Sequence, residues 1–158
     1  YVTMAHRLWG IETVVLRYFN VFGPRQDPNG DYAAVIPKFV SRLVTGNAPI
    51  IFGDGQQTRD FLYIDDVVAA NLTAATHQAA PGGIFNVARG EAKSLLSLLG
   101  ILQSSTGLKV EAEFQPERPG DFVHSAADTS RLNDTLGFIP TTSLDRGLAA
   151  TAQYFQKK

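Results

Sequence analysis

The segment TVVLRYFNVFGPRQDPNG, residues 13–30, decides the predicted fold of this chain. Its first part, residues 13–18, is β-branched and apolar, which is typical of a buried strand in a parallel sheet. The following stretch, from Asn20 to Asp31, contains Gly23, Pro24, Pro28 and Gly30 and therefore predicts a loop. Ligands bind beyond the carboxyl ends of such strands in open α/β sheets, so Asn20 becomes a candidate ligand residue.

Hydrophobic periodicity divides the rest of the chain into helices and strands. Helical spacing predicts helices over residues 1–9, 33–45, 65–77, 94–105, 128–136 and 143–154. Short apolar or alternating runs predict strands over residues 49–52, 61–64, 84–87 and 109–114, with a polar loop over residues 53–60. This succession of elements predicts a mixed α/β fold. The acidic pair Asp65 and Asp66 is interpreted as a helix start, with no functional role.

The composition excludes several classes of protein and site. The chain has 158 residues, enough for one domain, and a net charge of −1 without a basic stripe. It therefore predicts no nucleic-acid or membrane-surface partner. The absence of cysteine excludes disulfides and thiolate metal sites, the three histidines lack metal-ligand spacing, and no metal is expected. No apolar run approaches the ~18 residues that span a bilayer, so a cytoplasmic enzyme or binding domain is the expectation.

Two motifs of dinucleotide-dependent enzymes are missing or misplaced. None of the 14 glycines forms a G-x-G-x-x-G turn, which would cradle a pyrophosphate. Tyr154 and Lys158 match Tyr-x-x-x-Lys formally, but they lie on the last turn of the chain and are interpreted as an amphipathic helix end. The sequence therefore assigns no catalytic residue.

Five short motifs carry a family resemblance. They are LRYFNVFGPRQDP (16–28), YAAVIP (32–37), FGDG (52–55), TRDF (58–61) and RPGD (118–121). In this order they resemble the extended short-chain dehydrogenase family of NAD-dependent NDP-sugar epimerases and dehydratases, and in particular the UDP-hexose and UDP-N-acetylglucosamine 4-epimerases. The resemblance covers essentially the whole chain.

The resemblance implies a particular architecture. It is the C-terminal substrate-binding part of an extended short-chain dehydrogenase, with the last pieces of a truncated Rossmann-like parallel sheet. Residues 1–28 would be the remnant of the NAD-binding domain, and residues 29–158 a sugar-nucleotide-binding domain partly interleaved with the sheet. The opening YVTMAHRLWG has no initiator methionine or capping residue, so a fragment is expected, with Tyr-x-x-x-Lys and most of the NAD site upstream of Tyr1.

The same resemblance implies roles for individual residues. Tyr18 and Phe19 would back the nicotinamide of NAD. The residues that would bind the UDP-sugar are Asn20, Ala34, Val35, Ile50, Phe52, Arg59, Arg118, Asp121 and Ser125. Among these, the arginine pair would hold the diphosphate, because a guanidinium meets phosphate oxygens two at a time.

The other binding residues would divide the rest of the ligand. Phe52 would stack on uracil beside Ile50, Asp121 would accept ribose hydroxyls, and the nucleotide would meet Ala34 and Val35 largely through the backbone. Ser125 would act as a gate beside the C2 substituent of the sugar, where a small residue leaves room for an N-acetyl group.

Each assignment has a simpler alternative. Asn20 and Asp121 could be turn residues, Phe52 a core residue, and the two arginines solvated surface charges. Ser125 could simply start the helix near Asp128, while Arg25 and Lys38 are basic residues near the site that could equally face water.

Three functions remain open at this level. The first is a 4-epimerase, in which NAD takes a hydride from C4 of the sugar and returns it to the opposite face after the keto sugar rotates. The second is a dehydratase or decarboxylase of the same family, and the third is a non-catalytic nucleotide-sugar-binding module. The intact parent is expected to be a homodimer, whereas this chain alone is expected to be inactive and to self-associate through its uncovered strand.

Overall fold

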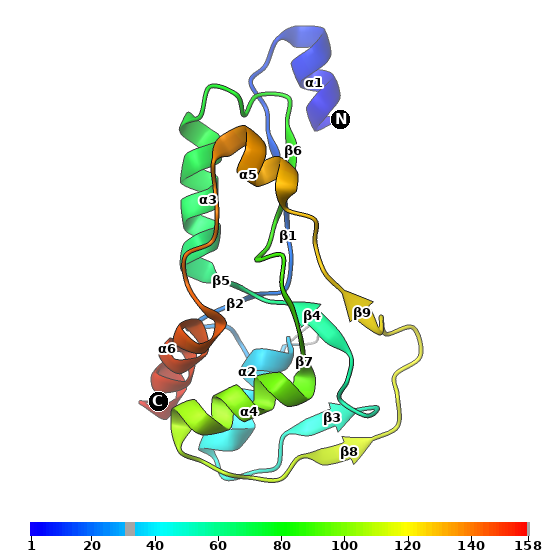
Figure 1. The fold of residues 1–158 in the computed structure, drawn as a ribbon, viewed down its shortest axis with the longest axis vertical. Coiled ribbons are helices and arrows are strands. Elements are labelled where there is room, and N and C mark those ends of the chain that lie inside the picture. The colour runs from blue at the N-terminus through cyan, green and yellow to red at the C-terminus, as the bar shows by residue number, and fades with distance from the viewer. Residues whose placement is uncertain (31–33, 158) are drawn as a thin grey trace.

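The computed structural model describes residues 1–30 and 34–157, and it confirms the mixed α/β fold. The elements form two groups along one long axis (Figure 1). The predicted helix start at Ala33, the Tyr32–Ala33 part of the second motif and Lys158 lie outside the described residues.

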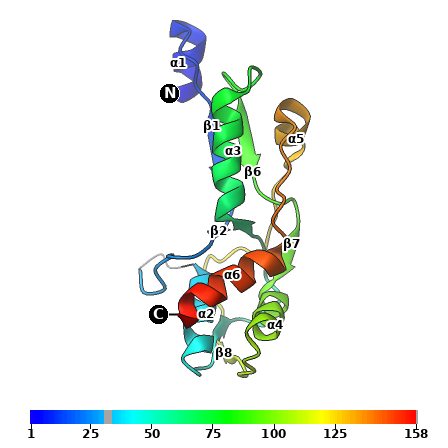
Figure 2. The same cartoon turned by 90° about the vertical axis from the view of Figure 1, so that its left-hand side faces the viewer.

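The first group is built on a pair of parallel strands. Strand β1 (Val15–Tyr18) pairs with β6 (Ile84–Val87), and both are close to their predicted positions. Helix α3 (Ile64–Thr76) packs across the pair, and α5 (Ser130–Leu136) lies alongside β6 (Figure 2). Phe85 and Val87 of β6 are buried in one cluster with Val67 of α3 and Leu132 of α5. Helix α1 (Val2–Trp9) stands at the far end and stops at Gly10, whose φ of 67° is left-handed.

The second group is a helical cluster with a short sheet beside it. Helices α2 (Val35–Val44), α4 (Leu95–Thr106) and α6 (Leu144–Gln156) bury a second apolar cluster. The buried residues of α2 recur at helical spacing, namely Ile36, Phe39, Val40 and Leu43. Strand β3 (Ile50–Phe52) pairs in parallel with β8 (Glu113–Gln115) at the edge of this cluster.

Two small sheets join the groups. Strand β4 (Thr58–Asp60) lies between β7 (Ala92–Ser94) and β9 (His124–Ser125), and β2 (Val21–Phe22) pairs with β5 (Leu62–Tyr63). Helix α6 approaches the β2–β5 pair closely at Gly147, where a Cβ would meet the rings of Phe22 and Tyr63 at 2.8 and 2.9 Å. Glycine is therefore needed at this contact, which holds the helical cluster against the sheets.

Several predicted loops and strands were wrong in extent. The predicted loops over residues 20–31 and 53–60 contain β2 and β4, so Arg59 lies on a strand rather than in a loop. The predicted strand 61–64 ends at Tyr63, because Ile64 already begins α3, and the strand predicted over 109–114 is only β8. β1 was predicted to be buried, yet its last residues, Arg17 and Tyr18, are exposed. Strands of two or three residues depend on partners distant in the sequence, and this dependence leaves no periodic pattern.

The first group leaves apolar surface exposed, and this exposure supports the prediction that the chain self-associates. No residue of α1 is buried, and Met4, Leu8 and Trp9 are 53, 64 and 72% exposed. Within the described residues, β1 pairs only with β6, so its other edge is open. Burying such surface is favourable, and an open strand edge is a template for pairing. We expect dimers or larger species in light scattering at micromolar concentration, and a monodisperse monomer would contradict this prediction.

Candidate functional site

Three adjoining cavities lie beside α2. Together they form one groove, which is called the groove below. The first, of about 210 Å³, is lined by Asn20 and Arg59 and shares Val35 and Asp121 with the second. The second, of about 120 Å³, shares its lining with the third, of about 300 Å³. The residues common to these two are Lys38, Phe39, Ile50, Phe52 and Arg118. The groove therefore runs from the junction of the two groups to β3.

The groove collects most of the residues that the sequence singled out as ligands of the UDP-sugar. Those that line it are Asn20, Ala34, Val35, Ile50, Phe52, Arg59, Arg118 and Asp121. They come from the residue before β2, from the start of α2, from β3 and β4, and from the segment between β8 and β9. The fold therefore gathers positions up to about a hundred residues apart. Ser125 does not line any of the three cavities, and neither do Tyr18 and Phe19.

Ser125 nevertheless lies next to the groove. It belongs to β9, where the register pairs it with Arg59 of β4, so the alternative of a helix start is wrong. Directly paired residues of neighbouring strands project from the same face of a sheet. The Ser125 side chain is half-buried and shares a face of the sheet with Arg59, which lines the first cavity.

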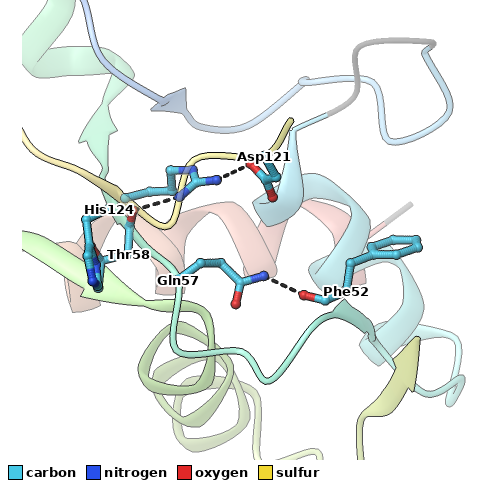
Figure 3. Close-up of polar contacts among 6 residues, drawn as sticks. Phe52, Gln57, Thr58, Asp121 and His124 are labelled. Atoms are coloured by element: carbon cyan, nitrogen blue, oxygen red, sulfur yellow. Dashed lines mark hydrogen bonds and ion pairs between the residues drawn. The ribbon is translucent and has the colours of Figure 1, made fainter. Parts of the chain in front are cut away.

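Arg59 and Asp121 form an ion pair at the first cavity (Figure 3). The guanidinium also donates from Nη1 to the carbonyl oxygen of Thr58 at 2.8 Å. The Arg59 side chain is 15% exposed and that of Asp121 43% exposed, so one partner is held while the other remains accessible. The carboxylate thereby orients the guanidinium, which keeps further N–H donors for a ligand.

Arg118 is stacked on the ring of Phe52, with its Cζ atom 3.7 Å from the ring centroid. Such a cation–π contact is worth about 0.5–1 kcal/mol at an exposed site, which a ligand contact can exceed. The strand end that carries Phe52 is fixed by Gln57, whose Nε2 donates to the Phe52 carbonyl oxygen at 2.6 Å (Figure 3). One face of the Phe52 ring is therefore occupied by a movable guanidinium above a fixed strand.

Asn20 has an unusual backbone conformation, and its side chain is hydrogen-bonded. Its φ is 28°, in the left-handed region that non-glycine residues rarely adopt. Asparagine tolerates this region better than most other non-glycine residues do. Its Nδ2 donates to the carbonyl oxygen of Asp60 at 2.9 Å, and its own carbonyl accepts from Leu62. The amide oxygen and one N–H remain for a ligand, because the NH₂ group carries two donors.

Asp60 holds the segments of the site together, a role that was not predicted from the sequence. It is 0% exposed, and its carboxylate accepts backbone N–H groups of Arg89 and Gly90 at 2.9 Å and of Ala127 at 3.4 Å. These bonds tie β4 to the turn after β6 and to the segment after β9. Asp66 has a similar role on α3, where its carboxylate accepts from the backbone of Thr141 and Thr142. The one signal in the sequence was the position of Asp60 within the TRDF motif, next to a predicted ligand residue.

Two groups have shifted pKa values for local reasons. Burial, and then the charge of Asp65, raises the pKa of Tyr63 above its usual range. Hydrogen bonds from the side chain and backbone of Ser130 lower the pKa of Asp128. Neither residue lines the groove, so these shifts belong to the scaffold.

The two residues expected near NAD, Tyr18 and Phe19, lie at the end of β1. Tyr18 is 47% exposed at the end of β1, and its hydroxyl donates to Oδ1 of Asn71 at 2.9 Å. The sequence has no glycine-rich turn for a pyrophosphate. The Tyr18 side chain is thus bonded to α3, and the expected role of Tyr18 and Phe19 beside the nicotinamide stays a prediction. Across residues 1–30 and 34–157, no cluster of potential metal ligands and no helix able to cross a membrane occurs.

Comparison of this chain with known proteins identifies its family. The profile of the NAD dependent epimerase/dehydratase family matches residues 1–88. A UDP-glucose 4-epimerase of Mycolicibacterium smegmatis is 37% identical over 100% of this chain and 50% of its own length. Other relatives are a UDP-N-acetyl-alpha-D-glucosaminuronate decarboxylase of Bacillus cytotoxicus and a dTDP-glucose 4,6-dehydratase of Streptomyces griseus, each 32% identical.

Two solved structures are also very similar. A UDP-glucose 4-epimerase of Thermotoga maritima with UDP-glucose has a TM-score of 0.93 and 39% identity, over 99% of this chain and 50% of that one. A UDP-N-acetylglucosamine 4-epimerase of Methanobrevibacter ruminantium, in complex with UDP-N-acetylmuramic acid, has a TM-score of 0.92 and 41% identity, over 98% and 49%. The chain spans about half the length of the relatives it matches. With a matching profile over more than half of its residues, the chain belongs to the NAD dependent epimerase/dehydratase family.

Proposed function

We propose that the groove binds the nucleotide part of a UDP-sugar, and that this chain supplies the sugar-nucleotide-binding half of an NAD-dependent 4-epimerase. The observation that carries the proposal is the gathering of the eight predicted ligand residues along one groove. Scattered surface residues would have no reason to share a cavity. The similar 4-epimerase structures, at 39 and 41% identity, support the same substrate class.

The groove has chemistry suited to each part of such a ligand. Ile50 and Phe52 offer apolar and aromatic surface for the base, and Val35 closes the same cavity from α2. Base–aromatic stacking is worth about 1–3 kcal/mol. Uracil on the face of Phe52 that Arg118 now covers would displace the guanidinium, which is then available to the phosphates.

The charged residues suit a diphosphate and a ribose. Arg59 and Arg118 line adjoining cavities that share Asp121, so the two residues lie along one stretch of the groove. A phosphate would compete with Asp121 for Arg59, and the released carboxylate is a natural acceptor for two ribose hydroxyls. Asn20 and Ser125 lie at the Arg59 end, where the sugar is then expected.

The parent enzyme is assigned on the same basis. Bound NAD supplies the hydride acceptor for oxidation at C4 of the sugar. Tyr18 and Phe19 would form one wall of that site, within a division into an NAD-binding part up to residue 28 and a sugar-nucleotide-binding part over 29–158. We infer a homodimer for the parent. The decarboxylase and dehydratase relatives support a second candidate, a family member that performs one of those reactions.

Calorimetry of this chain with UDP-glucose, UDP-N-acetylglucosamine and dTDP-glucose tests the function. We expect measurable binding of the UDP-sugars and weaker binding of dTDP-glucose. Tighter binding of dTDP-glucose would favour the dehydratase candidate. Absence of binding by all three at millimolar concentration would contradict the proposed function.

Ser125 is expected to determine which sugars fit. Because it shares the face of Arg59, a larger side chain there would project toward the sugar end of the groove. Steric overlap in a packed site cannot be relaxed cheaply, with typical costs of about 1–3 kcal/mol. The variant Ser125→Tyr should weaken binding of UDP-N-acetylglucosamine by about tenfold or more while UDP-glucose changes little. Equal effects on the two sugars, measured by calorimetry, would show that Ser125 is not the gate.

A further inference from the structure

Lys38 is a cation at the end of the groove where the nucleobase is proposed to bind. It lies on α2, is half-buried, and lines both cavities that Phe52 and Ile50 line. Within the described residues, its ammonium has no hydrogen bond, ion pair or cation–π partner. Arg42, one turn further along α2 and lining the third cavity, is different, because its Nε donates to the carbonyl oxygen of Ala48. Lys38 is therefore the less constrained of the two cations, although the Arg42 guanidinium keeps its other N–H donors.

From its position on α2, Lys38 would meet the edge of a bound nucleobase rather than the face of its ring. Lys38 and Val35 are three residues apart on α2 and so lie on one side of the helix. They line the second cavity from the helix, while Ile50 and Phe52 line it from β3. A planar base that lies against the Phe52 ring presents its edge to the residues around it. The ammonium on the helix is in place to meet an edge atom.

The chemistry of a lysine allows a choice between pyrimidines. Uracil has a carbonyl oxygen at C4, and cytosine has an amino group there. A lysine ammonium donates hydrogen bonds and accepts none, so it favours the carbonyl and disfavours the amino group. Asn29, which lines the third cavity, cannot make this distinction, because its amide can rotate to donate or accept.

We propose that Lys38 determines base specificity by donating a hydrogen bond to the O4 atom of uracil. This inference rests on the proposed function and adds a residue that the sequence left undecided between the site and the solvent. Arg59 and Arg118 remain the residues for the diphosphate.

The test measures dissociation constants of UDP, CDP and inorganic pyrophosphate for wild type, Lys38→Met, Lys38→Arg and Lys109→Met. Methionine keeps the apolar stem without the charge, and the exposed Lys109, which lines none of the groove's cavities, is the matched control. Wild type should bind UDP about tenfold or more tighter than CDP, as a charged hydrogen bond implies. Lys38→Met should lose about tenfold in UDP affinity and keep its CDP affinity, Lys38→Arg should lose less, and Lys109→Met should match wild type.

Three results would overturn the inference. If UDP, CDP and pyrophosphate all weaken equally in Lys38→Met, the ammonium acts on the phosphates. If UDP binding is unchanged, Lys38 has no role in recognition. If wild type itself fails to bind UDP, the proposed function falls together with this inference. Retained CDP binding by Lys38→Met, together with an unchanged thermal midpoint, would confirm that this variant is folded.

Discussion

Replacing Arg118 by alanine is expected to weaken the binding of UDP by about tenfold to a hundredfold, because one charged hydrogen-bonding group is worth about 1.5–3 kcal/mol. Arg118 is exposed, and its guanidinium stacks on the face of Phe52, so its loss should not disturb the fold. The loss should be similar for UDP and UDP-sugars, since the contact is to phosphate. Arg118→Lys should recover only part of the affinity, because an ammonium cannot form the bidentate fork.

Arg59 should respond differently, because it is paired with Asp121. Arg59→Ala leaves a carboxylate unpaired beside the incoming diphosphate, so the loss of UDP affinity should exceed that of Arg118→Ala. The double variant Arg59→Ala/Asp121→Asn should recover part of it by removing the repulsion. Arg7→Ala is the control, since Arg7 is exposed on α1 and lines none of the groove's cavities. Unchanged UDP affinity in both single alanine variants, measured by calorimetry, would refute the assignment.

Replacing Asp60 by alanine should cause the largest loss of stability among the site residues. The carboxylate is fully buried and accepts three backbone N–H groups, and each buried donor left without a partner costs about 1–3 kcal/mol. We expect a decrease of at least about 3 kcal/mol in the free energy of unfolding. Asp60→Asn should lose less, because one oxygen remains to accept while the amide NH₂ faces the other donors.

The matched control for Asp60 is Asp54, which lies between β3 and β4 and lines none of the groove's cavities. Asp54 is exposed and accepts a single backbone N–H, that of Gln56, at 2.8 Å. Asp54→Ala should therefore change the free energy of unfolding by about 1 kcal/mol or less. The measurement is the urea midpoint and slope for each variant. Similar losses at the two aspartates would mean that Asp60 does not hold the segments of the site together.

The elements that could be predicted are those with a local signal. Strand β6 was predicted at its observed residues, and α4 begins beside Ser94, whose hydroxyl accepts from the Ser97 N–H, and ends at a left-handed Gly107. These features depend on neighbours within a few residues. Strands β2, β4 and β9 depend on pairing across tens of residues, and the apolar pattern of such short segments is too weak to reveal it.

The site shows the same division. Motifs indicated the ligand residues, but only the fold shows that Arg59 is paired with Asp121 and that Arg118 covers Phe52. Neither contact has a sequence signature, because each joins segments more than sixty residues apart. Asp60 and Lys38 were missed or left open for a related reason. A charged side chain gives no sign in the sequence of whether it is buried among backbone donors or lines a cavity.

The most direct test of the central claim is to follow the backbone amide resonances of the ¹⁵N-labelled chain during a titration with UDP. The shifts should concentrate at residues that line the groove, on α2, at the end of β3, at Arg59 and over residues 118–121. Residues around a separate cavity of about 350 Å³, lined by Glu12, Val14 and His77, should not respond. Shifts centred on that cavity, or no shifts at millimolar UDP, would contradict the claim that the groove is a nucleotide-binding site.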